Sequence, residues 1–149
     1  MYLLDTNHCS RIINGDSSVI SRLQQSAGVG VATSVIVRGE LIFMAQNSQQ
    51  RTANLQRVRA FLQAIDLYPV NGSVSDRYGE LKAKLYEHFA PKERNKRRRT
   101  KIQDLGFDDN DLWIAATAIH CSFTVVSVDS DFPRIQQALP LTLENWIAG

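Results

Sequence analysis

Four acidic side chains occupy positions where a carboxylate needs an explanation. Asp5 ends a short apolar run at residues 2–4, and Asp129 ends another at residues 125–128. Asp111 opens the most apolar helical stretch of the chain. Glu40 shares one face of an expected helix with four apolar side chains, those of Ile36, Val37, Phe43 and Met44. A carboxylate on such a buried face needs a partner or a cation.

Each acid taken alone has a plain structural explanation. Asp5 fits the N-cap of the next helix, Asp129 fits a turn, and Asp111 suits the positive end of a helix. For Glu40 the equivalent is a salt bridge to a distant Arg. Taken together, acids that converge would repel one another, and a bound divalent cation removes that conflict. Oxygen ligands without His or Cys select Mg²⁺ or Mn²⁺, which suits chemistry on phosphate esters.

The elements that must position these acids alternate along the chain. Apolar runs predict strands at residues 2–4, 29–32, 67–70 and 124–128, with a weaker fifth at 141–143. Helical patterns cover residues 7–14, 17–25, 35–45, 50–65, 73–89 and 111–120. This alternation predicts an α/β sandwich whose central, mostly parallel sheet has four or five strands, with the third run at an edge because of Pro69. Ligands bind such sheets beyond the carboxyl ends of the strands, where the strand order reverses.

Length and composition favour one globular domain over residues 1–149. Of the 149 residues, 44% are hydrophobic and 21% are charged, with a net charge of +2. Two cysteines form no disulfide framework and no zinc-type cluster, and the longest apolar run, at residues 112–119, is too short to span a bilayer. These features exclude a membrane span and a secreted disulfide scaffold, and they predict a cytoplasmic protein.

Four motifs, in this order, resemble those of a known family. They are Leu-Leu-Asp-Thr-Asn at residues 3–7, Ser-Val-Ile-Val-Arg-Gly-Glu-Leu at 34–41, Asn-Asp-Leu-Trp-Ile-Ala-Ala-Thr-Ala at 110–118 and Val-Ser-Val-Asp-Ser-Asp-Phe at 126–132. The chain resembles PIN-domain ribonucleases, specifically the VapC-type toxins of type II toxin–antitoxin systems, over essentially its whole length. The resemblance implies a three-layer α/β/α sandwich and an endoribonuclease that depends on Mg²⁺ or Mn²⁺. It also implies a cognate antitoxin, a homodimer and a structured RNA substrate.

The resemblance carries roles over to individual residues. The catalytic acids are Asp5, Glu40, Asp111 and Asp129. The expected metal ligands are Asp5, Asp111 and Asp129. The auxiliary residues are Thr6, Ser127 and Asp131. Glu40 would bind a second ion or orient the attacking water, whose attack on the phosphate would leave a 3′ hydroxyl and a 5′ phosphate.

Residues 91–106 form the one clear shift in composition, and we interpret them as a basic insertion or loop. This segment is longer and more basic than the resemblance leads us to expect. Its candidate RNA-binding residues are Lys92, Arg94, Lys96, Arg97, Arg98, Arg99 and Lys101. Seven cations against one Glu give residues 91–101 a charge of +6, which leaves −4 for the rest of the chain. A polyanion fits this asymmetry, and contact with an acidic antitoxin or a solvated loop without a partner are the alternatives.

Other functions remain open from the sequence. Asp129 and Asp131 after an apolar strand also suggest an aspartate-based phosphatase, although that pattern normally follows the first strand. A phosphoacceptor signalling domain would need an acidic pair after the first strand, where only Asp5 stands. A catalytically degenerate PIN-like module that binds RNA or protein is a further alternative. Of the three histidines only His8 lies near an acid motif, and a helix cap or a core position explains it.

Overall fold

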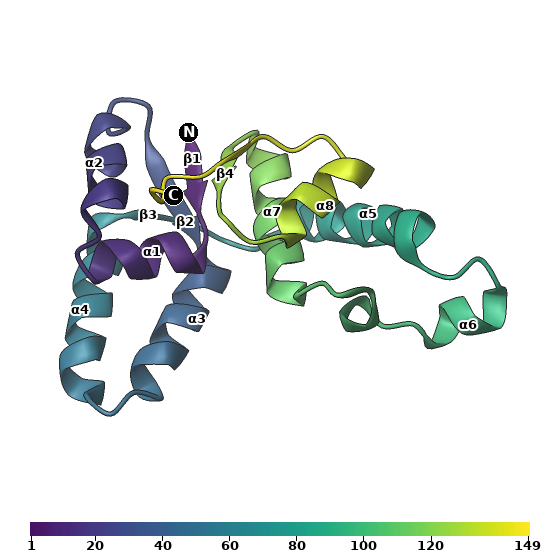
Figure 1. Cartoon of the computed structure of the whole chain (residues 1–149), viewed down its shortest axis with the longest axis horizontal. Helices are drawn as coiled ribbons and strands as arrows, with labels where there is room; N and C mark the ends of the chain where they lie inside the picture. Colours follow the sequence, from purple (N-terminus) through teal and green to yellow (C-terminus); the bar gives the residue numbers. More distant parts are fainter.

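A five-stranded parallel sheet forms the middle of the molecule (Figure 1). A computed structural model describes residues 1–149. The strands are β1 (Tyr2–Leu4), β2 (Val31–Ser34), β3 (Asp66–Tyr68), β4 (Thr124–Val126) and β5 (Leu143–Glu144). They lie in the order β3-β2-β1-β4-β5, and every neighbouring pair is parallel. The α/β fold with a central parallel sheet, predicted from the alternating pattern, is therefore confirmed.

The strand order reverses at β1. The chain first adds β2 and β3 on one side of β1 and later adds β4 and β5 on the other. In the sheet Leu4 pairs with Thr33 on β2 and with Val126 on β4, so β1 and β4 end at the same level and β2 ends one residue further on. The carboxyl ends of β1 and β4 therefore flank the switch point of the sheet, where such folds bind ligands.

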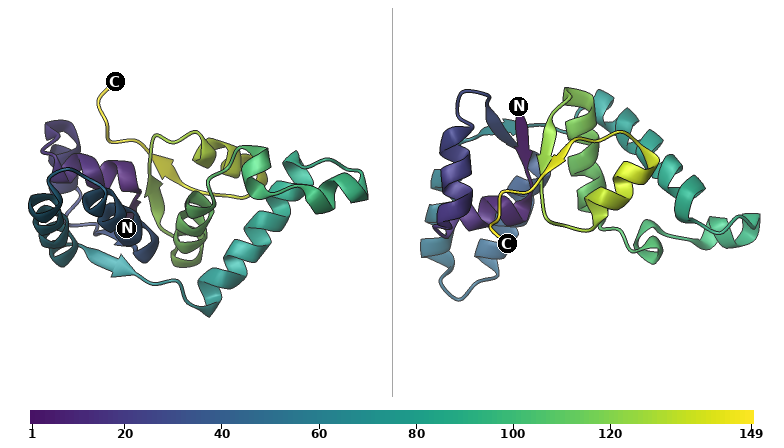
Figure 2. Two further views of the ribbon diagram at one scale, coloured as in Figure 1. Left: turned by 90° about the horizontal axis from the view of Figure 1, so that it is seen from below. Right: turned by 45° about the horizontal axis from the view of Figure 1, so that its top comes forward.

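Helices cover both faces of the sheet (Figure 2). On one side lie α1 (Thr6–Ile13), α2 (Ser17–Gln25), α3 (Val35–Gln46) and α4 (Arg51–Ala64). On the other side lie α5 (Gly72–Phe89), α7 (Asp109–Cys121) and α8 (Asp131–Ala138). The short helix α6 (Arg94–Arg99) lies beyond the end of α5, and η1 (Ile102–Leu105) follows where the chain runs back toward α7. None of these helices is both long enough and apolar enough to cross a membrane.

Polar caps begin the helices that carry the acidic motifs. Asp5 accepts a hydrogen bond from the backbone N–H of His8 and begins α1. Ser34 caps α3 in the same way through the N–H of Val37, and Asp108 begins α7. Side-chain caps satisfy backbone donors that a helix leaves free at its first turn. The change from strand to helix is therefore fixed at the residues where the motifs lie.

The structure corrects three expectations about the elements. β2 begins at Val31 rather than at residue 29, because Gly30 takes a left-handed φ of +99° in the preceding turn. The helix α8 was not predicted from the sequence. Residues 91–106 are not a plain loop, because they form α6 and η1. The Lys and Arg residues that made this segment look like a solvated loop are also good helix formers.

Candidate active site

The carboxyl ends of β1 and β4 and residues of the helices α1, α3 and α7 surround a polar hollow of about 300 Å³. Asp5 follows β1, Glu40 lies on α3, Asp111 lies in the first turn of α7, and Asp129 follows β4. The hollow is lined by Asp5, Thr6, Asn7, Ser10, Glu40, Met44, Asp108, Asp111 and Asp129. The four acids that were predicted to be catalytic thus line one hollow at the switch point of the sheet.

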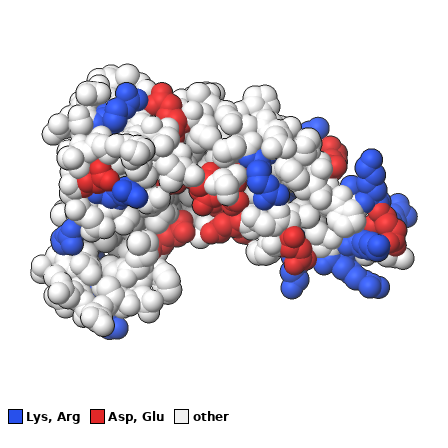
Figure 3. Space-filling model, viewed as in Figure 1, with Lys and Arg blue, Asp and Glu red and all other residues white.

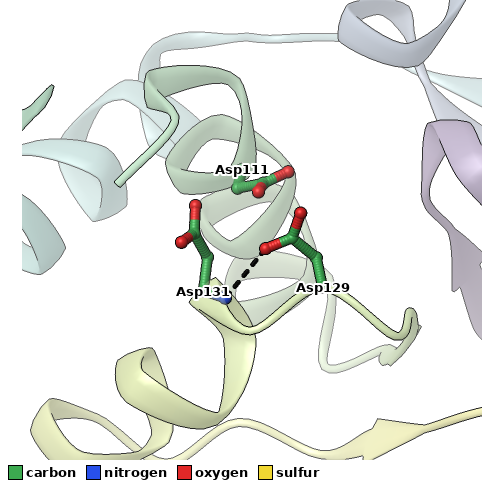
Figure 4. Close-up of side chains that lie close together, drawn as sticks. All are labelled: Asp111, Asp129 and Asp131. Carbon is green, nitrogen blue, oxygen red and sulfur yellow. Dashed lines mark hydrogen bonds between the residues drawn. The ribbon is translucent and has the colours of Figure 1, made fainter. Parts of the chain in front are cut away.

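Three aspartates form the tightest group within this region (Figure 4). One carboxylate oxygen from each of Asp111, Asp129 and Asp131 lies within 4.8 Å of the other two. Asp131 is only 5% exposed, and its Oδ2 accepts a hydrogen bond from the N–H of Asp108 at 2.9 Å. The N–H of Asp131 in turn donates to Oδ1 of Asp129 at 2.9 Å. Asp131 was predicted to be an auxiliary residue, and in the structure it belongs to the tightest group of carboxylates.

The crowding of carboxylates changes the acidity of Asp111. Burial raises the pKa of its carboxyl to about 9, and its contact with Asp131 and the charges of Asp129 and Asp108 act in the same direction. Each of these effects disfavours the ionised form. In the absence of a cation, this site therefore holds a proton that a free aspartate would have lost.

The Asp5 carboxylate is held in place on both of its oxygens. Oδ1 accepts hydrogen bonds from the backbone N–H and the ring Nδ1 of His8, at 2.9 and 3.0 Å. Oδ2 accepts a hydrogen bond from the Ser127 hydroxyl, whose oxygen also accepts one from the N–H of Asp129 at 3.0 Å. Ser127 thereby links the acid after β1 to the acid after β4. Asp5 is both the cap of α1 and a lining residue of the hollow.

Glu40 has a hydroxyl partner and no cationic one. Thr6 Oγ1 donates a hydrogen bond of 2.7 Å to Glu40 Oε1. Glu40 makes no salt bridge, so the alternative of a distant Arg partner is wrong. Thr6 and Glu40 lie 34 residues apart in the sequence, and they meet because α1 and α3 pack together beside the sheet.

Two residues near the acids were not assigned to the site from the sequence. His8 is fully buried, and its Nε2 accepts a hydrogen bond of 3.2 Å from the N–H of Trp146. The ring proton therefore lies on Nδ1, which donates it to Asp5. Asp108 both lines the hollow and positions Asp131. In the sequence, only its position three residues after Asp5, the N-cap of α1, pointed to His8.

The side chains present fit a divalent cation bound by oxygen ligands. Five carboxylates line the hollow, the carboxylate of Asp131 lies within 4.8 Å of two of them, and no Lys or Arg forms an ion pair with any of the six. No Cys side chain lines the hollow, and the nearby His8 has both ring nitrogens engaged. Such a donor set is typical of Mg²⁺ and Mn²⁺ sites.

The basic residues at positions 92–101 lie away from this hollow. Figure 3 shows acidic side chains gathered in the middle of one face and basic side chains gathered at the far end, over α6. Arg97 differs from its neighbours because its guanidinium donates to main-chain oxygens of Pro91 and Tyr86, at 3.1 and 3.5 Å. The other six cations are exposed.

Comparison with known proteins identifies the family. The PIN domain family model matches residues 2–138. A curated relative from Rickettsia felis, named Ribonuclease VapC2, is 30% identical, with 98% of each chain covered, and one of the same name from Haemophilus influenzae is 25% identical over the same share. The chain belongs to the PIN domain family, and within it to the VapC-type proteins.

Solved structures support this assignment. The structure of VapBC2 from Rickettsia felis bound to a DNA fragment from its promoter contains a chain that is 28% identical to this one, with a TM-score of 0.80 and 98% of each chain covered. A chain in DNA-bound VapBC from Salmonella typhimurium has a TM-score of 0.78 at 20% identity, again with 98% of each chain covered, and this likeness is one of fold. The predicted resemblance to VapC-type PIN domains is therefore confirmed.

Proposed function

We propose that this protein is the toxin of a toxin–antitoxin pair and acts as an endoribonuclease that depends on Mg²⁺ or Mn²⁺. The observation that carries the proposal is the hollow at the switch point, which is lined by Asp5, Glu40, Asp111 and Asp129 without a Lys or Arg partner. The relatives named as ribonucleases add support from outside the structure. All four acidic positions are intact, which argues against a degenerate module that only binds.

The chain's own residues supply the ligands and their orientation. Asp111, Asp129 and Asp131 would hold the cation, with Asp5 on the β1 side of the hollow. When bound, the cation neutralises charge on a phosphate and favours deprotonation of water. Ser127 and His8 keep the Asp5 carboxylate in one orientation through their hydrogen bonds.

In this proposal Glu40 would orient the attacking water. Its Oε1 is held by Thr6, and its Oε2 takes part in no hydrogen bond, so it remains free to accept one from water in the hollow. Attack in line with the leaving 3′ oxygen gives a 3′ hydroxyl and a 5′ phosphate. This route needs no nucleophile from the protein and no covalent intermediate.

The toxin assignment also requires partners. The structural relatives include complexes described as VapBC and a toxin–antitoxin complex from Klebsiella pneumoniae, the latter with a TM-score of 0.60 at 18% identity. We propose a cognate antitoxin and a homodimer for this chain. We expect the neighbouring gene to encode the antitoxin as a small DNA-binding protein. Co-expression of that protein should inhibit this chain.

The nuclease proposal is tested by cleavage of a structured RNA with purified protein. Asp5→Asn keeps the shape of the side chain and removes its charge, so cleavage should fall by about 100-fold or more, the scale on which changes around a metal site act. Asp76→Asn, at an exposed position on α5, is the matched control and should cleave like the wild type. Cleavage by Asp5→Asn at the wild-type rate, with contaminating nuclease excluded, would disprove the assignment.

A further inference from the structure

The segment that follows α5 is a built arm rather than a flexible connection. We call residues 91–106 the basic arm. The Tyr86 hydroxyl on α5 donates a 2.7 Å hydrogen bond to the main-chain oxygen of Thr100, and Arg97 donates to that of Pro91. Side-chain bonds of this kind fix where α6 lies relative to α5, so the charges on α6 have defined positions.

The other end of the basic arm is fastened to the body of the protein. Arg134 on α8 donates a 2.7 Å hydrogen bond to the main-chain oxygen of Leu105, and its guanidinium stacks between the rings of Phe89 and Phe107, at 4.7 and 4.0 Å from their centres. Ile102 is buried in the core. Because both ends are anchored, the arm holds α6 in a defined position relative to the acidic hollow.

The exposed surface of α6 offers positive charge and nothing apolar. Residues 92–101 contain seven Lys or Arg, one Glu, one Asn and one Thr. Lys96 pairs loosely with Glu93 at 3.8 Å, whereas Arg94, Arg98 and Arg99 form no ion pair. Protein interfaces gain most of their affinity from buried aromatic and apolar anchors, which this surface lacks. A polyanion backbone needs only spaced cations.

We propose that the basic arm binds the phosphate backbone of the RNA substrate at a distance from the bond that is cut. This inference rests on the proposed ribonuclease function and narrows its substrate to RNA that extends well beyond the scissile phosphate. Figure 3 supports the geometry, because the acidic and basic groups lie on one face, in the middle and at the far end of the molecule. An RNA lying across this face reaches both. Contacts to phosphates give affinity and register without reading bases.

The structure also distinguishes the cations of the arm that are free to contact phosphates. Arg94, Arg98 and Arg99 are exposed and unpaired, so their charges are available to phosphates. Arg97 is partly buried and bonded to the main chain, so its role is to hold the arm in shape. A substitution of Arg97 would change both the fold of the arm and its binding of RNA, so Arg97 is kept in the test variants.

The test compares two triple variants that remove the same charge. The arm variant combines Arg94→Gln, Arg98→Gln and Arg99→Gln. The control variant combines Arg59→Gln on α4 with Arg77→Gln and Lys84→Gln on α5. Binding of a long hairpin RNA is measured in EDTA over a range of salt concentrations. Three lost phosphate contacts lower the slope of log affinity against log salt by about 2–3, at 0.7 per contact for single strands and 0.9 for a duplex, which is about 100- to 500-fold in affinity at 0.1 M salt.

Cleavage in Mg²⁺ gives an independent readout. The arm variant should lose kcat/KM on the long hairpin and keep it on an oligonucleotide too short to reach α6, and the control should keep both. An unchanged salt slope overturns the proposal. If the RNA slope is unchanged and binding of a poly-glutamate peptide is lost, the arm docks an acidic protein instead. If the wild type binds RNA through the arm and cleaves nothing, the nuclease proposal fails while the binding surface stands.

Discussion

Replacing Asp111 by Asn should stabilise the metal-free protein while it abolishes cleavage. The pKa of Asp111 rises from 3.8 to about 9 on folding, because of burial first and of the neighbouring carboxylates next. The folded state thus binds this proton more tightly than the unfolded state does. Stability from this group is fully present below about pH 4 and is lost progressively as the pH rises toward 9. An Asn side chain does not ionise, so Asp111→Asn keeps this stability as the pH rises.

The size of the effect follows from the same shift. A shift of roughly five units corresponds to at most about 7 kcal/mol, at 1.36 kcal/mol per unit. Because Asp111 is only partly buried, solvent screens much of this, and we expect roughly 2–4 kcal/mol at pH 8. For a chain of this length that is a rise in Tm of about 5–15 °C, at 2–4 °C per kcal/mol.

The assay is thermal unfolding in EDTA at pH 5 and at pH 8, followed by circular dichroism. Asp111→Asn should melt well above the wild type at pH 8 and much closer to it at pH 5. Asp76→Asn serves as the control and should track the wild type at both values. Added Mg²⁺ should then raise the Tm of the wild type more than that of Asp111→Asn, since the cation replaces the proton. Equal Tm values for the two proteins at pH 8 in EDTA would refute the crowding argument.

Three further outcomes are expected. Mg²⁺ and Mn²⁺ should support RNA cleavage, EDTA should stop it, and Ca²⁺ should bind with little turnover because its loose geometry positions water poorly; full activity in EDTA after dialysis would contradict the mechanism. Glu40→Gln should lower kcat by about 100-fold, within the range for acid–base catalysis, with KM for RNA nearly unchanged; an unchanged kcat would remove Glu40 from the water-orienting role. His8→Leu should weaken Mn²⁺ binding, measured by calorimetry, by about 10–100-fold. His8→Asn should retain most of the wild-type affinity for Mn²⁺, because the Asn amide can donate a hydrogen bond to Asp5 as Nδ1 of His8 does. Equal Mn²⁺ affinities for His8→Leu and His8→Asn would show that His8 acts through packing alone.

Much of this architecture could be predicted from local sequence. Short apolar runs and the cap residues Asp5 and Ser34 are local signals, and they placed β1, α1 and α3 within a residue or two. The acids stood out for the same reason, because each interrupts or ends an apolar pattern. The helix α6 was missed because charge dominated the composition of its segment, although the same residues favour a helix.

Contacts between distant segments were decided only by the tertiary structure. The amino-acid sequence determined the fold class, the order of the motifs and four of the five acids that line the hollow, since these depend on hydrophobic period and residue type. It could not reveal that Ser127 bonds to Asp5 across 122 residues, or that the backbone of Trp146 sets the proton on His8. Nor could it distinguish Arg97, which is bonded to the main chain, from the free arginines Arg98 and Arg99 beside it. Those differences depend on which groups the packed helices and strands bring within hydrogen-bonding distance, and that distance is a property of the assembled fold.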